Sequence, residues 1–176
     1  MILACSGSFP YTPTAGMSEQ LYLDAKLNFS IKHPLDWERI RIPPSAPEFR
    51  ADTVRWKISN PLQKNNTVGG MLIRSIPGLG DRQLPDLLSD FLSGQPELEE
   101  GQVQPFSHPA GTALRLIGHD VVHTRLIIAL KGQRHDFIIS FDLPLDNSGE
   151  LLPLFEEVIE SFNEVRAPED HPSSES

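Results

Sequence analysis

The chain has little cysteine, no long apolar run and no block of basic residues. Its 176 residues include a single cysteine, which excludes an internal disulfide and a zinc cluster built from cysteines. The longest clean apolar run is Leu126 to Leu130, far below the ~18 residues that cross a membrane. Fifteen Lys and Arg stand against 24 Asp and Glu, for a formal charge of −9. Because no basic patch offsets this charge along the sequence, nucleic acid is not an expected partner.

The composition favours one globular domain without a recognisable reaction. Apolar residues make up 39% of the chain, which is enough for a hydrophobic core. Gly78-Leu79-Gly80 lacks the remaining residues of a nucleotide-binding fingerprint, and no G-x-S-x-G nucleophile elbow is present. The sequence therefore predicts neither a cofactor nor a metal, and no enzyme activity.

The N-terminal segment predicts a lipid anchor. Leu3-Ala4-Cys5 resembles the end of a bacterial lipoprotein signal, in which a small residue precedes the cysteine that is lipidated. Ser6 to Gly16 is rich in Ser, Pro, Thr and Gly, the composition of a tether. We expect residues 1–19 to be a lipobox-like start and flexible tether, with a lipid on Cys5 holding the protein on the periplasmic side of a bacterial envelope membrane. The alternatives are a free cysteine in a cytoplasmic protein, or a start codon that lies further upstream.

Alternating apolar and polar residues predict a series of strands. The first is a hairpin over Leu21–Lys32, followed by a short strand over Trp37–Ile42. A proline-rich loop of polyproline character is expected from Pro43, and a polar loop over Asn60–Thr67. The other expected strands are Thr53–Ser59, Val68–Ile76, Thr112–Gly118, His123–Lys131 and Arg134–Leu143.

Two segments carry a single apolar stripe at helical spacing, Leu84–Leu92 and Leu151–Phe162. An α+β fold follows, in which both helices cover the apolar side of one antiparallel sheet and the other side stays wet. We expect residues 20–165 to form this single domain and residues 166–176 to be a disordered tail.

The wet side of the sheet supplies the candidate site. A two-residue turn at Gly132-Gln133 would set His123 opposite Asp142. Because side chains alternate between the two faces of a strand, Arg125 and Asp136 are expected on the same surface. These four residues are the predicted binding group, although charged cross-strand neighbours are also common without any function. A His beside an Asp suits a general base or a metal ligand, and His119 near the strand end is the only further candidate ligand.

The segment Phe29-Ser30-Ile31-Lys32-His33-Pro34-Leu35-Asp36-Trp37 resembles the F-x-I-x-Y-P-x-x-W opening of PsbP-like domains. The family includes the photosystem II extrinsic protein and small bacterial lipoproteins of unknown role. Gly111 to Arg115, Phe137 to Phe141 and Phe155 to Phe162 look like the family's closing half. His33 departs from the pattern, because the family usually has an aromatic residue there.

The resemblance implies an α/β/α sandwich around an antiparallel sheet, a fold shared with a Ran-binding nuclear import factor. It also implies a protein that acts by docking on membrane complexes or partner proteins. No functional residue carries over. The leading expectation is a membrane-tethered binding or assembly module that uses the strand face or the loops Pro43–Phe49 and Asn60–Thr67. The alternative is a small-ligand binder or an enzyme with His123 and Asp142 as its polar groups.

Overall fold

The computed structural model describes residues 18–60, 63–78, 82–94, 101–145 and 148–165. Cys5, nearly all of the expected tether and the expected tail lie outside these ranges. The strands are β1 (Glu19–Asp24), β2 (Phe29–Pro34), β3 (Glu38–Ile40), β4 (Thr53–Asn60), β5 (Gln63–Pro77), β6 (Val103–His108), β7 (Gly111–His119), β8 (His123–Lys131), β9 (His135–Pro144) and β10 (Asn163–Glu164). The helices are α1 (Leu84–Ser93) and α2 (Ser148–Glu160).

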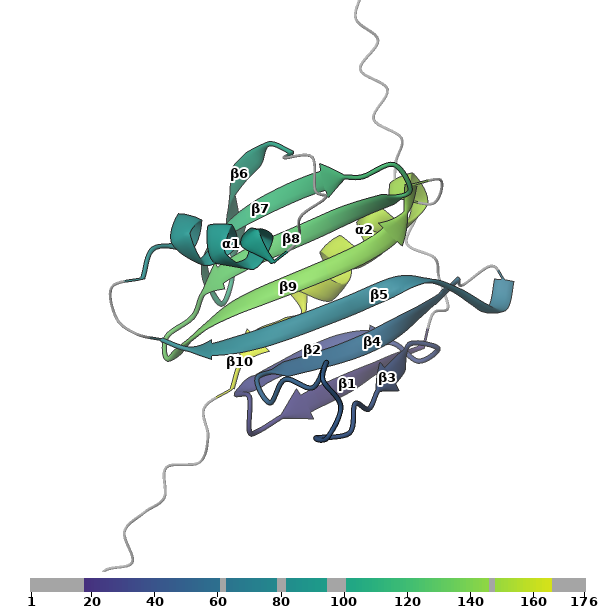
Figure 1. Ribbon diagram of the computed structural model, residues 1–176, viewed down its shortest axis with the longest axis horizontal. Helices are drawn as coiled ribbons and strands as arrows, with labels where there is room; N and C mark the ends of the chain where they lie inside the picture. The colour runs from purple at the N-terminus through teal and green to yellow at the C-terminus, as the bar shows by residue number, and fades with distance from the viewer. Residues whose placement is uncertain (1–17, 61–62, 79–81, 95–100, 146–147, 166–176) are drawn as a thin grey trace, which may run out of the picture.

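The strands form two antiparallel sheets (Figure 1). The larger sheet has seven strands in the order β3-β4-β5-β9-β8-β7-β6, and the smaller has three in the order β1-β2-β10. The first hairpin is confirmed, and its turn is fixed by Asp24, whose Oδ1 accepts the backbone N–H groups of Lys26 and Leu27 at 3.1 and 3.0 Å. Asn28 ends the turn at a φ of 59°, a conformation that asparagine tolerates better than most residues.

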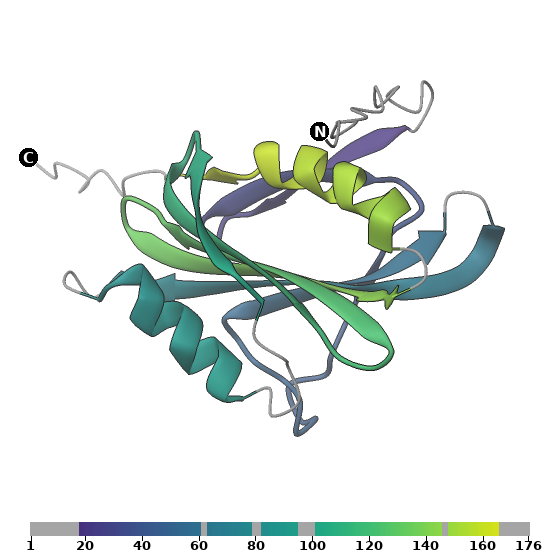
Figure 2. The same cartoon turned by 90° about the horizontal axis from the view of Figure 1, so that it is seen from above.

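The two helices pack against opposite faces of the larger sheet. This corrects the expectation, drawn from the apolar stripes, that both cover one side, and it agrees with the α/β/α layering that the family resemblance implied. Figure 2 shows α2 and the small sheet on one face and α1 on the other. The face under α2 holds the main core, where the rings of Phe141 and Phe155 stack 4.4 Å apart. The face under α1 holds a second apolar cluster, in which Leu88 packs with Ile127 and Ile138. The side that we expected to be wet is therefore partly a core.

The β8–β9 pairing differs from the expected register by two residues. Gly132 donates its N–H to the carbonyl of His135 at 3.0 Å, so the two central turn residues are Gln133 and Arg134. Lys131 consequently pairs with Asp136, and Arg125 rather than His123 pairs with Asp142. Because the slip is an even number of residues, each side chain still lies on the face that its parity predicted.

Two loop expectations are wrong, and one strand was not expected. Residues 63–67 of the expected polar loop belong to β5, which pairs with β4 through a bulge near Ser59. The proline-rich segment is a succession of tight turns, because Ala46 N–H donates to the carbonyl of Pro43 and Phe49 N–H donates to that of Ala46. Val103–His108 forms β6, an edge strand whose exposed residues and Pro105 gave no alternating signal.

Candidate functional site

The structure brings three of the four predicted binding residues to one end of the α1 face. Arg125 and Asp142 are direct cross-strand partners in β8 and β9. His123 lies two residues before Arg125 on the same face of β8, opposite Pro144. Asp136 starts the other end of β9, six residues or about 20 Å from Asp142 along the strand. The predicted group of four is therefore a group of three.

Arg125 holds this group together electrostatically. Its Nε lies 3.5 Å from Asp142 Oδ2, and its Nη2 lies 4.0 Å from Asp120 Oδ2. About 21% of the Arg125 side chain is exposed, so solvent screens its two ion pairs only in part. A cation between two carboxylates leaves a site with one net negative charge and polar groups that are well placed for recognition.

Asp120 is a member of the site that the sequence reasoning missed. Its Oδ1 accepts the backbone N–H groups of Val122 and His123 in the turn between β7 and β8. These two hydrogen bonds lower the pKa of the Asp120 carboxyl, and the nearby His123 ring, 3.5 Å from Oδ2, acts in the same direction. The available signal was an aspartate followed closely by the start of a strand, the usual position of an Asx turn.

Asp136 belongs to a structural ion pair. Its carboxylate is almost fully buried and lies 3.1 Å from the Nζ of Lys131. The same Nζ donates to the carbonyl of Arg82 at 3.0 Å, which ties the segment before α1 to the sheet. These contacts satisfy the buried carboxylate within the protein, and they leave Asp136 with a role in packing.

The hypothesis of a metal or acid–base pair at His123 and Asp142 loses its geometric basis. His123 contacts Asp120, and Asp142 contacts Arg125. His119 pairs with Thr124 in β8, so its parity sets it on the opposite face of the sheet. Among the residues that the structure describes, no three His, Cys, Asp or Glu side chains are arranged to hold a metal ion.

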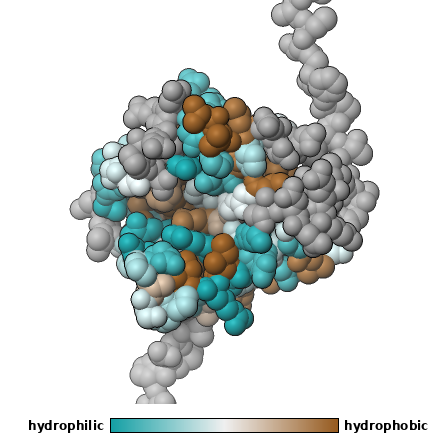
Figure 3. Space-filling model, turned by 45° about the vertical axis from the view of Figure 1, so that its right-hand side comes forward, coloured by the Kyte–Doolittle hydropathy of each residue, from teal (hydrophilic) through white to brown (hydrophobic). Residues whose placement is uncertain are grey.

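A hollow of about 250 Å³ opens beside α1 on this face. We call it the α1-side hollow, and its lining includes Ile40, Arg55, Leu72, Phe91, Arg125 and Asp142. Cross-strand pairing explains the gathering, because Ile40 faces Arg55, Arg55 faces Leu72, and Leu72 faces Ser140 in one row across four strands. Gly70 opposite Asp142 leaves the floor of the hollow without a side chain. On the side of the molecule drawn in Figure 3, hydrophobic residues form small separate patches among hydrophilic ones.

Two polar atoms at this hollow lack hydrogen-bond partners. Asp142 Oδ1 and Arg55 Nε are both buried, and neither meets a donor or acceptor of the protein. Leaving such a group unpaired costs about 1–3 kcal/mol, so proteins usually supply a partner. One is an acceptor and the other a donor, which suits a ligand that offers both kinds of group.

Two further histidines, His33 and His108, lie buried in strands away from the hollow. His33 in β2 donates from Nδ1 to the carbonyl of Pro34 and packs against Trp37 and Trp56. Its burial lowers the pKa of the ring below the usual 6.5. His108 in β6 accepts the N–H of Ala110 at Nδ1, so its proton is on Nε2, which donates to a carbonyl of α2. Both rings serve packing.

Comparison with solved structures identifies the fold as PsbP-like. The cyanobacterial PsbP of Synechocystis sp. PCC 6803 superposes with a TM-score of 0.58 at 15% sequence identity, over 86% of this chain and 95% of that one. PA94 of Pseudomonas aeruginosa, a protein of unknown function, gives 0.50 at 10% identity, over 81% and 94%. LpqN, involved in cell envelope biogenesis of Mycobacterium tuberculosis, gives 0.46 at 14% identity, over 77% and 82%, so only the first two bear on the fold.

No protein-family model and no curated protein sequence matches the chain. The resemblance noted in the sequence therefore agrees with the fold, while the identities show the fold alone. Within the described ranges, neither helix has the length and apolar character needed to cross a membrane.

Proposed function

We propose that the chain is a non-catalytic docking module of the bacterial cell envelope, which binds a partner protein at the α1-side hollow. The observation that carries the proposal is the pair of buried, unpartnered atoms, Arg55 Nε and Asp142 Oδ1, beside an open hollow with apolar walls. A peptide segment offers a carbonyl acceptor, an amide donor and apolar side chains together. Such a segment would pair both atoms and cover the walls.

The charged residues at this end of the sheet favour binding over catalysis. Arg125 is shared by Asp120 and Asp142, and the ring of His123 lies beside Asp120. A nucleophile activated by a neighbouring base is the usual arrangement for covalent chemistry, and these four side chains are instead arranged as a chain of ion pairs. The alternative occupant of the same hollow is a small molecule.

Photo-cross-linking in native membranes tests the docking surface. Ile40 lines the hollow and is 45% exposed, whereas Val103 is 46% exposed on β6 at the opposite edge of the same sheet. A photoreactive residue at position 40 is expected to give one discrete cross-linked protein, and the same residue at position 103 to give none. Equal products from both positions, or no product from position 40, would contradict the proposal.

We also propose that a lipid on Cys5 tethers the module to the membrane. The support is the sequence alone, where the single cysteine follows Leu3-Ala4 and precedes a stretch rich in Ser, Pro, Thr and Gly. Metabolic labelling with an alkyne fatty acid in the native host is expected to label the wild-type protein and not the Cys5→Ser variant. Recovery of unmodified Cys5 by mass spectrometry would refute the anchor and favour the cytoplasmic alternative.

A further inference from the structure

A second hollow adjoins the α1-side hollow at Arg55. It measures about 200 Å³ and is lined by residues 39–42 at the end of β3 and just beyond it, residues 48–50 of the turn segment and residues 53–55 of β4. We call it the arginine hollow. Ile40 and Arg55 line both hollows, so the two are neighbours, and we call the pair, which extends over β3, β4, β5 and β9, the depression.

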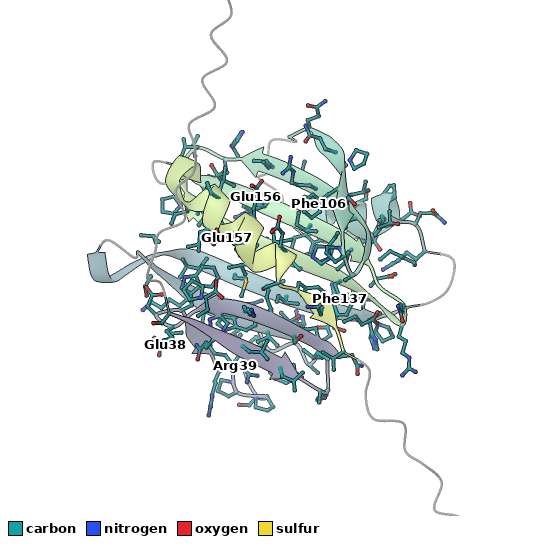
Figure 4. All side chains as sticks on the ribbon, turned by 180° about the vertical axis from the view of Figure 1, so that it is seen from behind. Glu38, Arg39, Phe106, Phe137, Glu156 and Glu157 are labelled. Carbon is teal, nitrogen blue, oxygen red and sulfur yellow. The ribbon has the colours of Figure 1, made fainter. Side chains whose placement is uncertain are left out.

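The arginine hollow concentrates positive charge on an acidic protein. Its lining includes Arg41, Arg50 and Arg55 and a single carboxylate, Glu48, although the chain as a whole has a formal charge of −9. Arg39 also borders the hollow, but its guanidinium carbon lies 5.1 Å from the ring centroid of Tyr22 in β1. Figure 4 shows Arg39 from the α2 side of the molecule. These arginines lie within residues 39–55, where Glu48 and Asp52 interrupt them, so the sequence showed no basic block.

The fold fixes the positions of Arg50 and Arg55 in this patch. Arg50 Nη1 donates to the carbonyls of Pro47 and Phe49 at 3.0 and 2.8 Å, which holds its guanidinium against the turn segment. Arg55 extends from the middle of β4, where it pairs with Ile40 on one side and Leu72 on the other. Its buried Nε has no acceptor. A guanidinium presents its donors in a planar fork that matches a carboxylate.

We infer that the depression recognises an acidic, aliphatic segment of a partner protein, with a carboxylate at Arg55 and an apolar side chain between Leu72 and Phe91. This inference rests on the proposed docking function and names the chemistry of the partner. Charge complementarity selects the occupant. A simple anion would not use the apolar walls of the α1-side hollow, and a nucleic acid backbone, which is charged at every nucleotide, would leave those walls uncovered.

The test uses the full purified chain and a fluorescein-labelled peptide in which two aspartates are flanked by leucines. A matched peptide carries asparagines in place of the aspartates. We expect the aspartate peptide to bind at least about tenfold more tightly by fluorescence anisotropy, and its binding to weaken as salt rises. In ¹⁵N NMR, the Nε–H signal of Arg55 should shift on binding because the donor gains an acceptor.

Variants separate recognition from folding. Arg55→Ala should weaken binding of the aspartate peptide about tenfold, and Arg55→Lys, which keeps the charge and loses the fork, should also weaken it. Arg115→Ala is the matched control, because Arg115 pairs with Glu156 of α2 on the opposite face at 3.1 Å. Its binding should equal that of the wild type, and thermal melting should report a folded protein for all three variants.

Three results would overturn the inference: equal binding of the two peptides, equal weakening by Arg115→Ala, or a shift of the Arg55 signal by phosphatidylglycerol vesicles and not by the aspartate peptide. None of these depends on the cross-linking experiment. A discrete product at position 40 together with equal peptide binding would refute the acidic segment and keep the docking function, whereas loss of the cross-linked product would refute the docking function.

Discussion

The carboxylate of Glu164 accepts the backbone N–H of His135 at 2.9 Å and lies 3.6 Å from Nδ1 of the same residue's ring. It also accepts the N–H groups of Gln133 and Arg134, the two central residues of the β8–β9 turn. One side chain from the last strand therefore satisfies three consecutive backbone donors of a distant hairpin. The turn keeps its position because of this contact.

Replacing Glu164 by Gln should destabilise the domain. The neutral amide retains one acceptor oxygen and loses the charge, and a hydrogen bond to a charged group is worth about 1.5–3 kcal/mol, so we expect a loss of about 2 kcal/mol in the free energy of unfolding. Urea denaturation measures it. Glu160→Gln, at an exposed position of α2, is the control and should change the free energy by less than about 0.5 kcal/mol. Equal losses in the two variants would contradict the role assigned to Glu164.

The same contact explains why the sequence predicts the β8–β9 hairpin and misplaces its turn. Gly132-Gln133 is a plausible turn from local preferences alone. The native turn at Gln133-Arg134 is favoured by Glu164, which lies about 30 residues further along the chain. Local patterns predict strands and faces, whereas a tertiary hydrogen bond selects between registers that local patterns allow.

Adjacent glycines in β5 should respond in opposite ways to alanine. A Cβ at Gly69 would lie 2.1 Å from the backbone carbonyl oxygen of Asp142, so Gly69→Ala must separate β5 from β9. We expect a loss of about 3 kcal/mol or more. A Cβ at Gly70 would meet its nearest neighbour, the carbonyl of Trp56, at 3.5 Å, which is an ordinary contact. Gly70→Ala should therefore keep the melting temperature of the wild type within a few degrees.

Gly70→Ala also tests the α1-side hollow, because Gly70 lines its floor. The added methyl group narrows the space available to a partner side chain, so the aspartate peptide should bind several-fold more weakly. A Gly70→Ala protein that binds as tightly as the wild type would show that the floor of the hollow is not used.

Core substitutions under the two helices should be additive. Leu88→Ala removes apolar volume on the α1 face at a cost of about 2–5 kcal/mol, and Ile159→Val removes one methylene on the α2 face at about 0.5–1.5 kcal/mol. Because the sheet separates the two sites, the double variant should equal the sum within about 0.5 kcal/mol. Phe141→Leu and Phe155→Leu, whose rings stack at 4.4 Å, should instead show a coupling above about 0.5 kcal/mol.

The apolar stripes did not predict that the helices lie on opposite faces, as the α/β/α sandwich implied by the family resemblance does, although the strands carried a signal for it. The run from Leu126 to Leu130 is fully buried on both parities. A strand that is apolar on consecutive residues is covered on both faces, whereas the alternation in the neighbouring strands suggested one wet face. An apolar stripe shows that one side of a helix is buried, and it does not tell against which face of the sheet the helix packs.

Stability should fall with acid through His33. Burial lowers the pKa of this histidine in the folded state below its unfolded value of about 6.5, and the weaker opposing effects of the Pro34 carbonyl and Asp36 do not restore it. The unfolded state therefore binds the proton more readily, and the contribution of His33 to stability is present above pH 6.5 and is lost as the pH falls through the folded pKa.

The measurement is the free energy of unfolding in urea at pH 7.5, 6.5 and 5.5. His33→Phe, which keeps an aromatic ring against Trp37 and Trp56, should show a smaller loss between pH 6.5 and 5.5 than the wild type. His119→Gln, at an exposed position, should follow the wild-type profile. A His33→Phe protein with the wild-type slope would assign the acid sensitivity to other groups.

The sequence predicted which residues of β8 and β9 share the face of the candidate site, and it did not predict which of them contact one another. Parity alone sets Arg125, His123 and Asp142 on one face, as expected. Asp120 acts through a turn, and Arg55 reaches the hollow from a strand that is about 70 residues away in sequence from β8. Contacts of this kind depend on strand order, which one sequence does not specify.

The small sheet joins Ser30 of β2 to Asn163 of β10, and Phe29 to Glu164. Nearly the whole domain must be synthesised before these strands can meet, because the pairing partners stand at its two ends. One edge of the N-terminal hairpin therefore stays unpaired until β10 has been made. A chain arranged in this way cannot complete the small sheet until residues 163–164 have been synthesised.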